Sequence, residues 1–394
     1  MSRRCAVPLA LALGVTACGL NEPSFNPPPV DAPFEAITAG VLHTCAVTVS
    51  AHVYCWGWNR DGELGDGSRS DRPLPVQVSG SVSFGSASGG GGHTCAVATG
   101  GQPFCWGFNL SGQLGDSTLS ARSRPVAVVG ALTLATLDAG GAFTCGIAVD
   151  STGWCWGWGA HGQLGDGTRT DRRSPVAVLG GLKLIALSGG IEHACAVAAD
   201  SSAWCWGAND LGQLGDASTT DTTRPVPVAG GRKFTAVSVG YSHSCALESS
   251  GDVYCWGDNS LGQLGDTMVN QASVPGLVVG GLSFLSVSAG AGHTCGVTAG
   301  GAAYCWGSDA SGQLGSDAVS LCTTATGTQL CTRVPTLVTG GLTFQVVSAG
   351  TQHSCGLTNA GIAFCWGLND HGQLGDGTGR RNTSPVRVGK QGGT

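Results

Sequence analysis

The chain consists of short apolar stretches that are separated by glycine-rich turns and recur at a fixed interval. Residues 174–215 illustrate one interval. They contain a stretch opened by Pro175, an alternating stretch from Leu182, and two further stretches that begin at His193 and Trp204. Alternation with a period of two, bounded by glycine, is typical of half-buried β-strands. The pattern therefore predicts four short antiparallel strands per interval and no long helix.

A pair of cysteines marks each interval, because a cysteine is followed ten residues later by Cys-Trp-Gly seven times. The first six pairs are spaced by 50 residues and the last step is 60, so one repeat carries an insertion. Units of this size cannot bury a core alone and must share one with their neighbours. Seven four-stranded units predict an all-β fold, a seven-bladed β-propeller of four-stranded blades.

The two ends of the repeat region complement each other. Residues 34–40 match a second strand with no Pro-Val strand before it, and Ser384–Val388 supply a Pro-Val strand at the other end. We therefore expect a propeller over residues 34–394, closed by N- and C-terminal strands that share one blade, rather than an open solenoid. The insertion covers about 316–334 and contains Cys322 and Cys331.

The N-terminus has the features of an export signal. Arg3 and Arg4 precede an apolar run that ends in Val-Thr-Ala-Cys18, which resembles the processing box of bacterial lipoproteins. The sequence predicts a lipoprotein signal peptide over 1–17 and a Pro-rich tether over 18–33. The tether would begin at an acylated Cys18, whose lipid would anchor the protein in the bilayer. Gly19 fits delivery to the outer membrane of a Gram-negative cell. The alternative is an ordinary secretory cleavage site.

Sixteen of the 18 cysteines remain once Cys5 and Cys18 are set aside, and an even number in an exported chain indicates disulfides. A hairpin about Ser50 would place the first pair face to face. The alternative is a metal site, because six repeats have a histidine two residues before the first cysteine. We expect no metal, because repeat three has Phe143 there and keeps both cysteines. The predicted disulfides are Cys45–Cys55, Cys95–Cys105, Cys145–Cys155, Cys195–Cys205, Cys245–Cys255, Cys295–Cys305, Cys322–Cys331 and Cys355–Cys365.

Charge and motifs exclude several functions. The formal net charge is −6 and the chain has no basic run, which argues against a nucleic-acid partner. Phosphate loops and hydrolase motifs are absent, so we expect no cofactor and no catalytic residue. Asp66 and its equivalents follow Gly-x-Leu-Gly, where aspartate suits a turn, although spacings such as Asp66/Asp71 also allow the interpretation of a calcium site.

The repeat signature resembles a known family. Gly-x-x-His-[Thr/Ser/Ala]-Cys is followed by Cys-Trp-Gly-x-Asn-x-x-Gly-Gln-Leu-Gly-Asp, and the resemblance to the regulator of chromosome condensation repeat covers residues 34 to about 389. It implies a seven-bladed propeller with a protein-binding face. The founding member exchanges nucleotide on a small nuclear GTPase, and a secreted bacterial relative inhibits an enzyme by covering its active site. The predicted export and the lack of a basic arm argue against nucleotide exchange here.

Comparison of the repeats separates framework from function. The repeated histidine is expected to pack in the core and to bond a neighbouring backbone carbonyl, and the aromatic residues beside the second cysteine are expected to fill the core. The residues just after Cys-Trp-Gly vary, and in three successive repeats they are large aromatics, which are favoured at interfaces. The alternative is that they pack against neighbouring blades. The predicted partner-binding residues are Trp58, Arg60, Phe108, Leu110, Trp158 and His161.

The sequence thus predicts a monomeric, non-enzymatic protein-binding propeller displayed at the bacterial cell envelope. Two alternatives stay open, a nucleotide-exchange-like regulator of a small GTPase and a carbohydrate-active or carbohydrate-binding propeller. The disulfide-closed insertion is a second candidate for partner binding.

Overall fold

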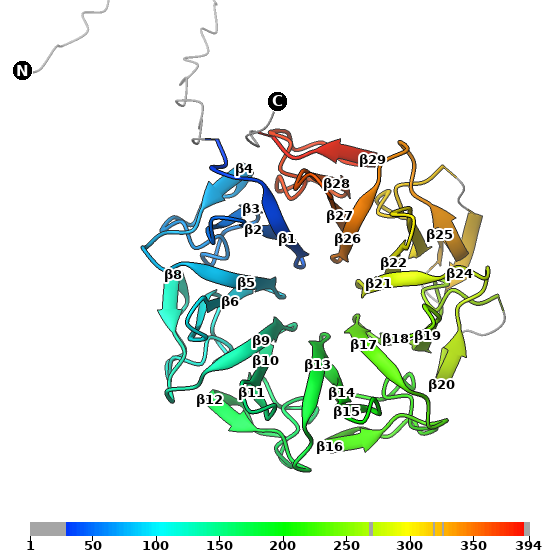
Figure 1. Ribbon diagram of the computed structural model, residues 1–394, viewed down its shortest axis with the longest axis horizontal. Coiled ribbons are helices and arrows are strands. Elements are labelled where there is room, and N and C mark those ends of the chain that lie inside the picture. Colours follow the sequence, from blue (N-terminus) through cyan, green and yellow to red (C-terminus); the bar gives the residue numbers. More distant parts are fainter. Residues whose placement is uncertain (1–28, 268–270, 318–319, 325–326, 390–394) are drawn as a thin grey trace, which may run out of the picture.

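The computed structural model describes residues 29–267, 271–317, 320–324 and 327–389, which form a closed ring of seven β-sheets around a central channel (Figure 1). The predicted signal peptide, Cys18 and the tether up to residue 28 lie outside the described residues. None of the described residues forms a helix of the length and apolarity that a membrane crossing requires. The predicted all-β propeller of seven blades is confirmed.

The innermost strand of each blade lies at the channel (Figure 1). Each begins with a buried Phe or Leu that packs into the core between blades and ends at a glycine-rich turn. These strands are β1 (Phe34–Ala39), β5 (Phe84–Gly89), β9 (Leu134–Ala139), β13 (Leu184–Gly189), β17 (Phe234–Val239), β21 (Phe284–Ala289) and β26 (Phe344–Ala349).

The middle of each blade is the cysteine hairpin. Its first strand is β2 (His43–Thr48), β6 (His93–Ala98), β10 (Phe143–Ala148), β14 (His193–Ala198), β18 (His243–Glu248), β22 (His293–Thr298) or β27 (His353–Thr358). Its second strand is β3 (Val53–Gly57), β7 (Pro103–Gly107), β11 (Gly153–Gly157), β15 (Ala203–Gly207), β19 (Val253–Asp258), β23 (Ala303–Ser308) or β28 (Ala363–Gly367). The two cysteines of each hairpin are directly opposite each other in the strand register, as predicted.

The fourth strand of each blade is the proline-containing segment that follows the hairpin. A proline on an edge strand removes a donor that would otherwise invite pairing with another chain. These strands are β4 (Arg72–Gln77), β8 (Arg122–Ala127), β12 (Arg172–Ala177), β16 (Thr222–Pro227), β20 (Gln271–Leu277), β25 (Gly327–Leu337) and β29 (Asn382–Arg387).

The division of the repeats into blades differs from the prediction. Each sheet consists of consecutive strands, so a Pro-Val strand completes the blade before it instead of opening the next one. The terminal strands β1 and β29 therefore lie in neighbouring blades and do not share one. The ring still closes where the ends meet: β1 lies beside β26 (Figure 1), and the Phe34 N–H donates to the Gly361 carbonyl at 3.0 Å.

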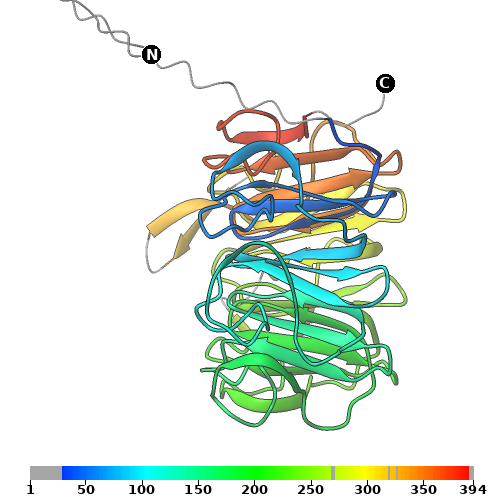
Figure 2. The ribbon, with the colours of Figure 1, turned by 90° about the vertical axis from the view of Figure 1, so that its left-hand side faces the viewer.

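The insertion forms a hairpin on the sixth blade. Strand β24 (Ser320–Thr324) pairs with the first part of β25, which makes this sheet five-stranded. The hairpin extends beyond the disc of blades in the side view (Figure 2). Cys322 and Cys331 are joined by a disulfide within it. Because it follows the Gly-Gln-Leu-Gly loop in the connection between β23 and β25, it emerges from the same end of the strands as the variable loops after Cys-Trp-Gly.

Candidate functional site

A repeated hydrogen-bonded joint connects successive blades. In the joint between the first two blades, the Thr94 hydroxyl and the Trp106 indole N–H both donate to the Glu63 carbonyl, at 2.7 and 2.8 Å. The His43 Nε2 atom lies 2.8 Å from the same hydroxyl. Because the hydroxyl proton is used on the carbonyl, Nε2–H is the donor to its oxygen. The histidine is therefore part of the framework, as predicted, but its acceptor is a hydroxyl of the next blade and not a backbone carbonyl.

This joint recurs at six of the seven blade interfaces, with Nε2–hydroxyl distances of 2.8–2.9 Å. Burial without a countercharge lowers the pKa of each histidine, to about 4 at His43 and about 3 at the other joints in which a histidine takes part. These imidazoles are neutral at physiological pH. The pairs are His43–Thr94, His93–Thr144, His193–Ser244, His243–Thr294, His293–Ser354 and His353–Thr44.

The interface between the third and fourth blades lacks this bond on both sides. Phe143 occupies the histidine position, and Ala194 occupies the position of the hydroxyl residue. Both are fully buried and lie in one apolar cluster. The remaining Trp206 indole still donates to the Gln163 carbonyl at 2.9 Å. An apolar contact therefore replaces the polar one, and the Gln163 carbonyl keeps a donor.

The cysteines are structural. All sixteen that the structure describes form the eight predicted disulfides, and the Cα atoms of the seven framework pairs lie 4.0–4.1 Å apart. The Asp66 carboxylate accepts the Ser68 N–H at 2.8 Å and the Arg72 Nε–H at 3.1 Å, so it serves a turn and an ion pair. Asp71 caps the Asn59 N–H at 3.0 Å. Among the described residues, no three His, Cys, Asp or Glu side chains are grouped to hold a metal ion.

The variable loops lie on one face, around the mouth of the channel. The Trp58 N–H donates to the Leu42 carbonyl at 2.9 Å, which places the residue after Cys-Trp-Gly beside the turn that borders the channel. The equivalent bonds hold Phe108 to Gly92 and Trp158 to Ala142. We call this surface the loop face.

The predicted partner-binding residues form two local clusters on the loop face. The partly exposed Trp58 ring contacts the His371 ring edge-on at 4.3 Å, and the Arg60 guanidinium lies 4.7 Å from the Trp58 ring centre. Trp158 contacts His161 at 5.2 Å. The His161 imidazole in turn lies 3.5 Å from the Asp221 carboxylate of the next blade.

Phe108 and Leu110 lie on the blade between these clusters. Phe108 packs against Gly92, and the Leu110 side chain is 67 % exposed. The described contacts bring none of the three aromatic residues Trp58, Phe108 and Trp158 against another. The predicted patch is therefore a row of separate residues on adjacent blades, in which Trp58 and His161 contact neighbouring blades.

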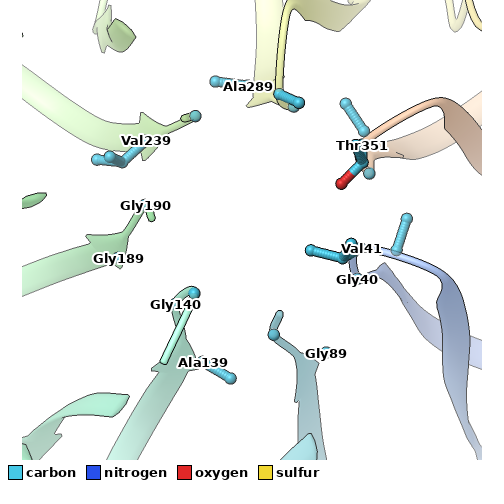
Figure 3. A pocket seen from close by; sticks show the side chains of 18 of the residues that line it. Gly40, Val41, Gly89, Ala139, Gly140, Gly189, Gly190, Val239, Ala289 and Thr351 are labelled. Carbon is cyan, nitrogen blue, oxygen red and sulfur yellow. The ribbon is translucent and has the colours of Figure 1, made fainter. Parts of the chain in front are cut away.

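A cavity of about 150 Å³ occupies the channel inside this ring of turns (Figure 3). Small residues such as Gly40, Gly89 and Gly140 surround it. One side chain per blade accepts a backbone N–H of the next blade here, at 2.9–3.1 Å. Six of these side chains are hydroxyls and one is a carboxyl. They are Thr38, Ser88, Asp138, Ser188, Ser238, Ser288 and Ser348.

Two acidic residues in repeat-equivalent positions were given no role from the sequence. Asp138 replaces the channel hydroxyl in the third blade, and Glu63 replaces the Gln of Gly-Gln-Leu-Gly in the first. The Glu63 carboxyl accepts the Asp61 N–H at 2.9 Å, and burial raises its pKa to about 7. The comparison of repeats that identified Trp58 also identifies these two residues, because every other repeat has a neutral residue at the equivalent position.

Fold and repeat together define the class: a closed seven-bladed propeller built from a 50-residue repeat with one variable face. The chain belongs to the family of the Regulator of chromosome condensation (RCC1) repeat. One family profile matches residues 50–97, 153–197, 200–247, 250–297, 300–357 and 360–393. A second profile of the same repeat matches residues 34–63, 185–213, 234–263, 284–313 and 345–373.

Solved structures share this fold at low sequence identity. Prp20p from Saccharomyces cerevisiae, described with its binding to Gsp1p and histones, is 22% identical with a TM-score of 0.77 over 87% of each chain. Human WBSCR16 is 20% identical with a TM-score of 0.76, over 86% of this chain and 93% of the other. The ectodomain of the receptor kinase ACR4 from Arabidopsis thaliana is 19% identical with a TM-score of 0.54, over 91% and 99%.

Proposed function

We propose that this protein is a non-enzymatic, protein-binding propeller of the bacterial cell envelope and that the loop face is its binding surface. The observation that carries the proposal is the contrast between the two parts of each repeat. The joints, disulfides and buried tryptophans are nearly the same in every blade, whereas the loop-face residues differ from blade to blade. Variation on a rigid scaffold is the usual arrangement of a recognition surface.

The first three blades provide the anchors. Trp58, Phe108 and Trp158 are large, partly exposed and held at the backbone, so they lose little conformational freedom on binding. The exposed Leu110 lies two residues after Phe108. Such residues at the centre of an interface contribute most of the binding energy when a partner excludes water from them.

Site-specific photocrosslinking in intact cells tests the loop face. A photoreactive residue at Leu110 is expected to give a discrete adduct with an envelope or extracellular protein. The matched control is Val149, which is 68 % exposed at the hairpin tip on the opposite face, where no adduct is expected. Changing Trp58, Phe108 and Trp158 together to Ala should abolish the Leu110 adduct while circular dichroism stays unchanged. Equal adducts from both faces, or none from Leu110, would contradict the proposal.

We further propose export and lipid anchoring at Cys18, toward the outer membrane. Eight disulfides support an oxidising compartment, since such bonds are rare in the reducing cytosol. Mass spectrometry of the mature protein should find an acylated N-terminal Cys18, and Cys18→Ala should release the propeller from the membrane fraction. A mature N-terminus elsewhere, without acylation, would contradict the anchor but leave the loop-face proposal untouched.

A further inference from the structure

The carboxyl group of Asp138 is an exception in a ring that otherwise needs only hydroxyls. Each ring member accepts a backbone N–H of the next blade, and a serine does this at five of the seven positions. Asp138 also does it, because its Oδ2 accepts the Gly189 N–H at 2.9 Å. Its second oxygen accepts the Ser88 hydroxyl at 2.7 Å. The structural task therefore does not require a carboxyl, and its charge needs another explanation.

Asp138 gives the channel cavity a single charge when its carboxyl is ionised. Of the described residues that line the cavity, it is the one with an ionisable carboxyl, and none of them is Lys, Arg or His. Its side chain is partly exposed, and the Ser188 hydroxyl, which also lines the cavity, bonds to the carboxyl in addition to Ser88 and Gly189. A charge in a narrow, low-dielectric channel acts more strongly on a ligand than the same charge at an open surface.

The turns that border the cavity mouth differ in size from blade to blade. The turns of the second and third blades carry Gly91 and Gly141, and a Cβ atom at Gly91 would lie 2.2 Å from the Gly141 carbonyl oxygen. The turns of the fourth and fifth blades carry Ile191 and Tyr241 instead. The Tyr241 hydroxyl is hydrogen-bonded to Thr351, two blades away, at 3.0 Å, so this ring is fixed at the cavity.

We propose that this cavity binds a primary ammonium or guanidinium group on a slender alkyl chain, with Asp138 as its counter-ion. A charged N–H donor complements the carboxylate in both charge and hydrogen bonding, and an aromatic ring that lines the same cavity can attract a cation. Ca²⁺ requires six to eight oxygen ligands and several carboxylates, which one aspartate does not supply. The group can belong to a free amine or to a Lys or Arg side chain of a bound protein.

Calorimetric titration of the full protein with n-butylammonium and n-butylguanidinium tests the site. Binding to the native protein is expected, and it should weaken by about tenfold or more in Asp138→Ser and Asp138→Asn. Serine is the residue that five other blades use at this position, so Asp138→Ser is expected to fold, as thermal unfolding will show. n-Butanol, which has the same chain without the charge, is the ligand control.

The outcomes separate cleanly. Loss of butylammonium binding in both variants, with native unfolding temperatures, supports the site. Absence of binding to the native protein at tens of millimolar, equal binding to Asp138→Ser, or binding of CaCl₂ in place of both amines overturns it. The inference goes beyond the loop-face proposal and does not depend on it, because no partner is used. The variant with Trp58, Phe108 and Trp158 changed to Ala should still bind n-butylammonium.

A basic side chain on a partner would give a different pattern from a free amine. A lysine or arginine that enters the channel requires the loop face to be covered, so n-butylguanidinium should then compete with the Leu110 photoadduct and Asp138→Ser should weaken it. A free-amine site predicts no competition. Burial raises the pKa of Asp138, and since only the ionised form attracts a cation, binding should weaken as the pH falls.

Discussion

The joint between the third and fourth blades allows a sharp test of how the ring is held together. Phe143 and Ala194 replace a histidine and a hydroxyl residue that the other six interfaces pair. Phe143→His alone buries an imidazole against the Ala194 methyl group and leaves Nε2–H without an acceptor. A buried unpaired donor costs about 1–3 kcal/mol. The smaller ring also loses apolar contact, so we expect a total cost of about 2–4 kcal/mol.

The double variant should recover most of this loss. In Phe143→His/Ala194→Thr, the new hydroxyl accepts from Nε2–H and donates to the Gln163 carbonyl, as Thr94 does with Glu63 in the first joint. The expected coupling energy between the two substitutions is about 1–3 kcal/mol in favour of the double variant. Ala194→Thr alone adds a hydroxyl beside the Phe143 ring, and its cost completes the double-mutant cycle.

The assay is equilibrium unfolding in guanidinium chloride without added reductant or oxidant, so that the disulfides stay intact. The four proteins of the cycle are measured side by side. The reverse change, His243→Phe/Thr294→Ala, is the matched control, because it converts a histidine joint into the apolar form found between the third and fourth blades. It should cost less than His243→Phe alone. Additive costs in both cycles, with coupling below about 0.5 kcal/mol, would refute the view that these pairs are energetic units.

Three further predictions concern titration and cross-linking. Because burial raises the pKa of Glu63 from 4.5 to about 7, the folded state keeps a proton that the unfolded chain has lost. Between pH 4.5 and 7 the free energy of unfolding of the native protein should therefore fall by up to about 3 kcal/mol relative to Glu63→Gln. Denaturation at stepped pH measures this, and parallel curves for the two proteins would exclude it. The six buried histidines act in the opposite direction, because the unfolded chain takes up protons below about pH 6.5 that the folded state accepts only near pH 3–4. The free energy of unfolding should therefore fall with acidification. His243→Phe/Thr294→Ala should reduce the slope of the free energy of unfolding against pH by about 1.4 kcal/mol per pH unit near pH 5. Cys45→Ser/Cys55→Ser should lower the free energy of unfolding by about 3 kcal/mol. Cys322→Ser/Cys331→Ser should cost the ring less, because this disulfide ties β25 to β24, a strand that the other six blades lack.

Features that recur in every repeat were predictable from the sequence because seven copies constrain the same interpretation. The hairpin register that brings Cys45 opposite Cys55 follows from local alternation and one turn, and the structure confirms it. The buried Trp56 and its equivalents were predicted on the same basis. The boundary between blades was not predictable in this way. A periodic sequence does not indicate where one blade ends and the next begins. From the sequence, β4 could pair with the hairpin before it or with β5 after it, and the hydrogen bonds of the structure place it with the hairpin.

The interactions that cross between blades were also out of reach. His43 and Thr94 are 51 residues apart, and nothing local to either residue indicates the other. The joint between the third and fourth blades contained the missing information. Its histidine and hydroxyl positions, which are also 51 residues apart, are both occupied by apolar residues, Phe143 and Ala194. Loop-face exposure was predicted only in part, since the sequence does not reveal that Trp58 lies against His371 of the last blade.

Repetition of the joints explains why function can concentrate in a few exceptions. Each interface combines an indole bond, an apolar core and a disulfide-closed hairpin, so the ring does not depend on the identity of any loop-face or channel residue. A carboxyl at position 138 is tolerated because it makes the same backbone bond as the serines that it replaces. Substitution back to serine should therefore remove a charge without removing a structural contact. If Asp138→Ser instead lowered the unfolding temperature as much as a broken joint does, the carboxyl would belong to the framework, and the cationic ligand would lose its rationale.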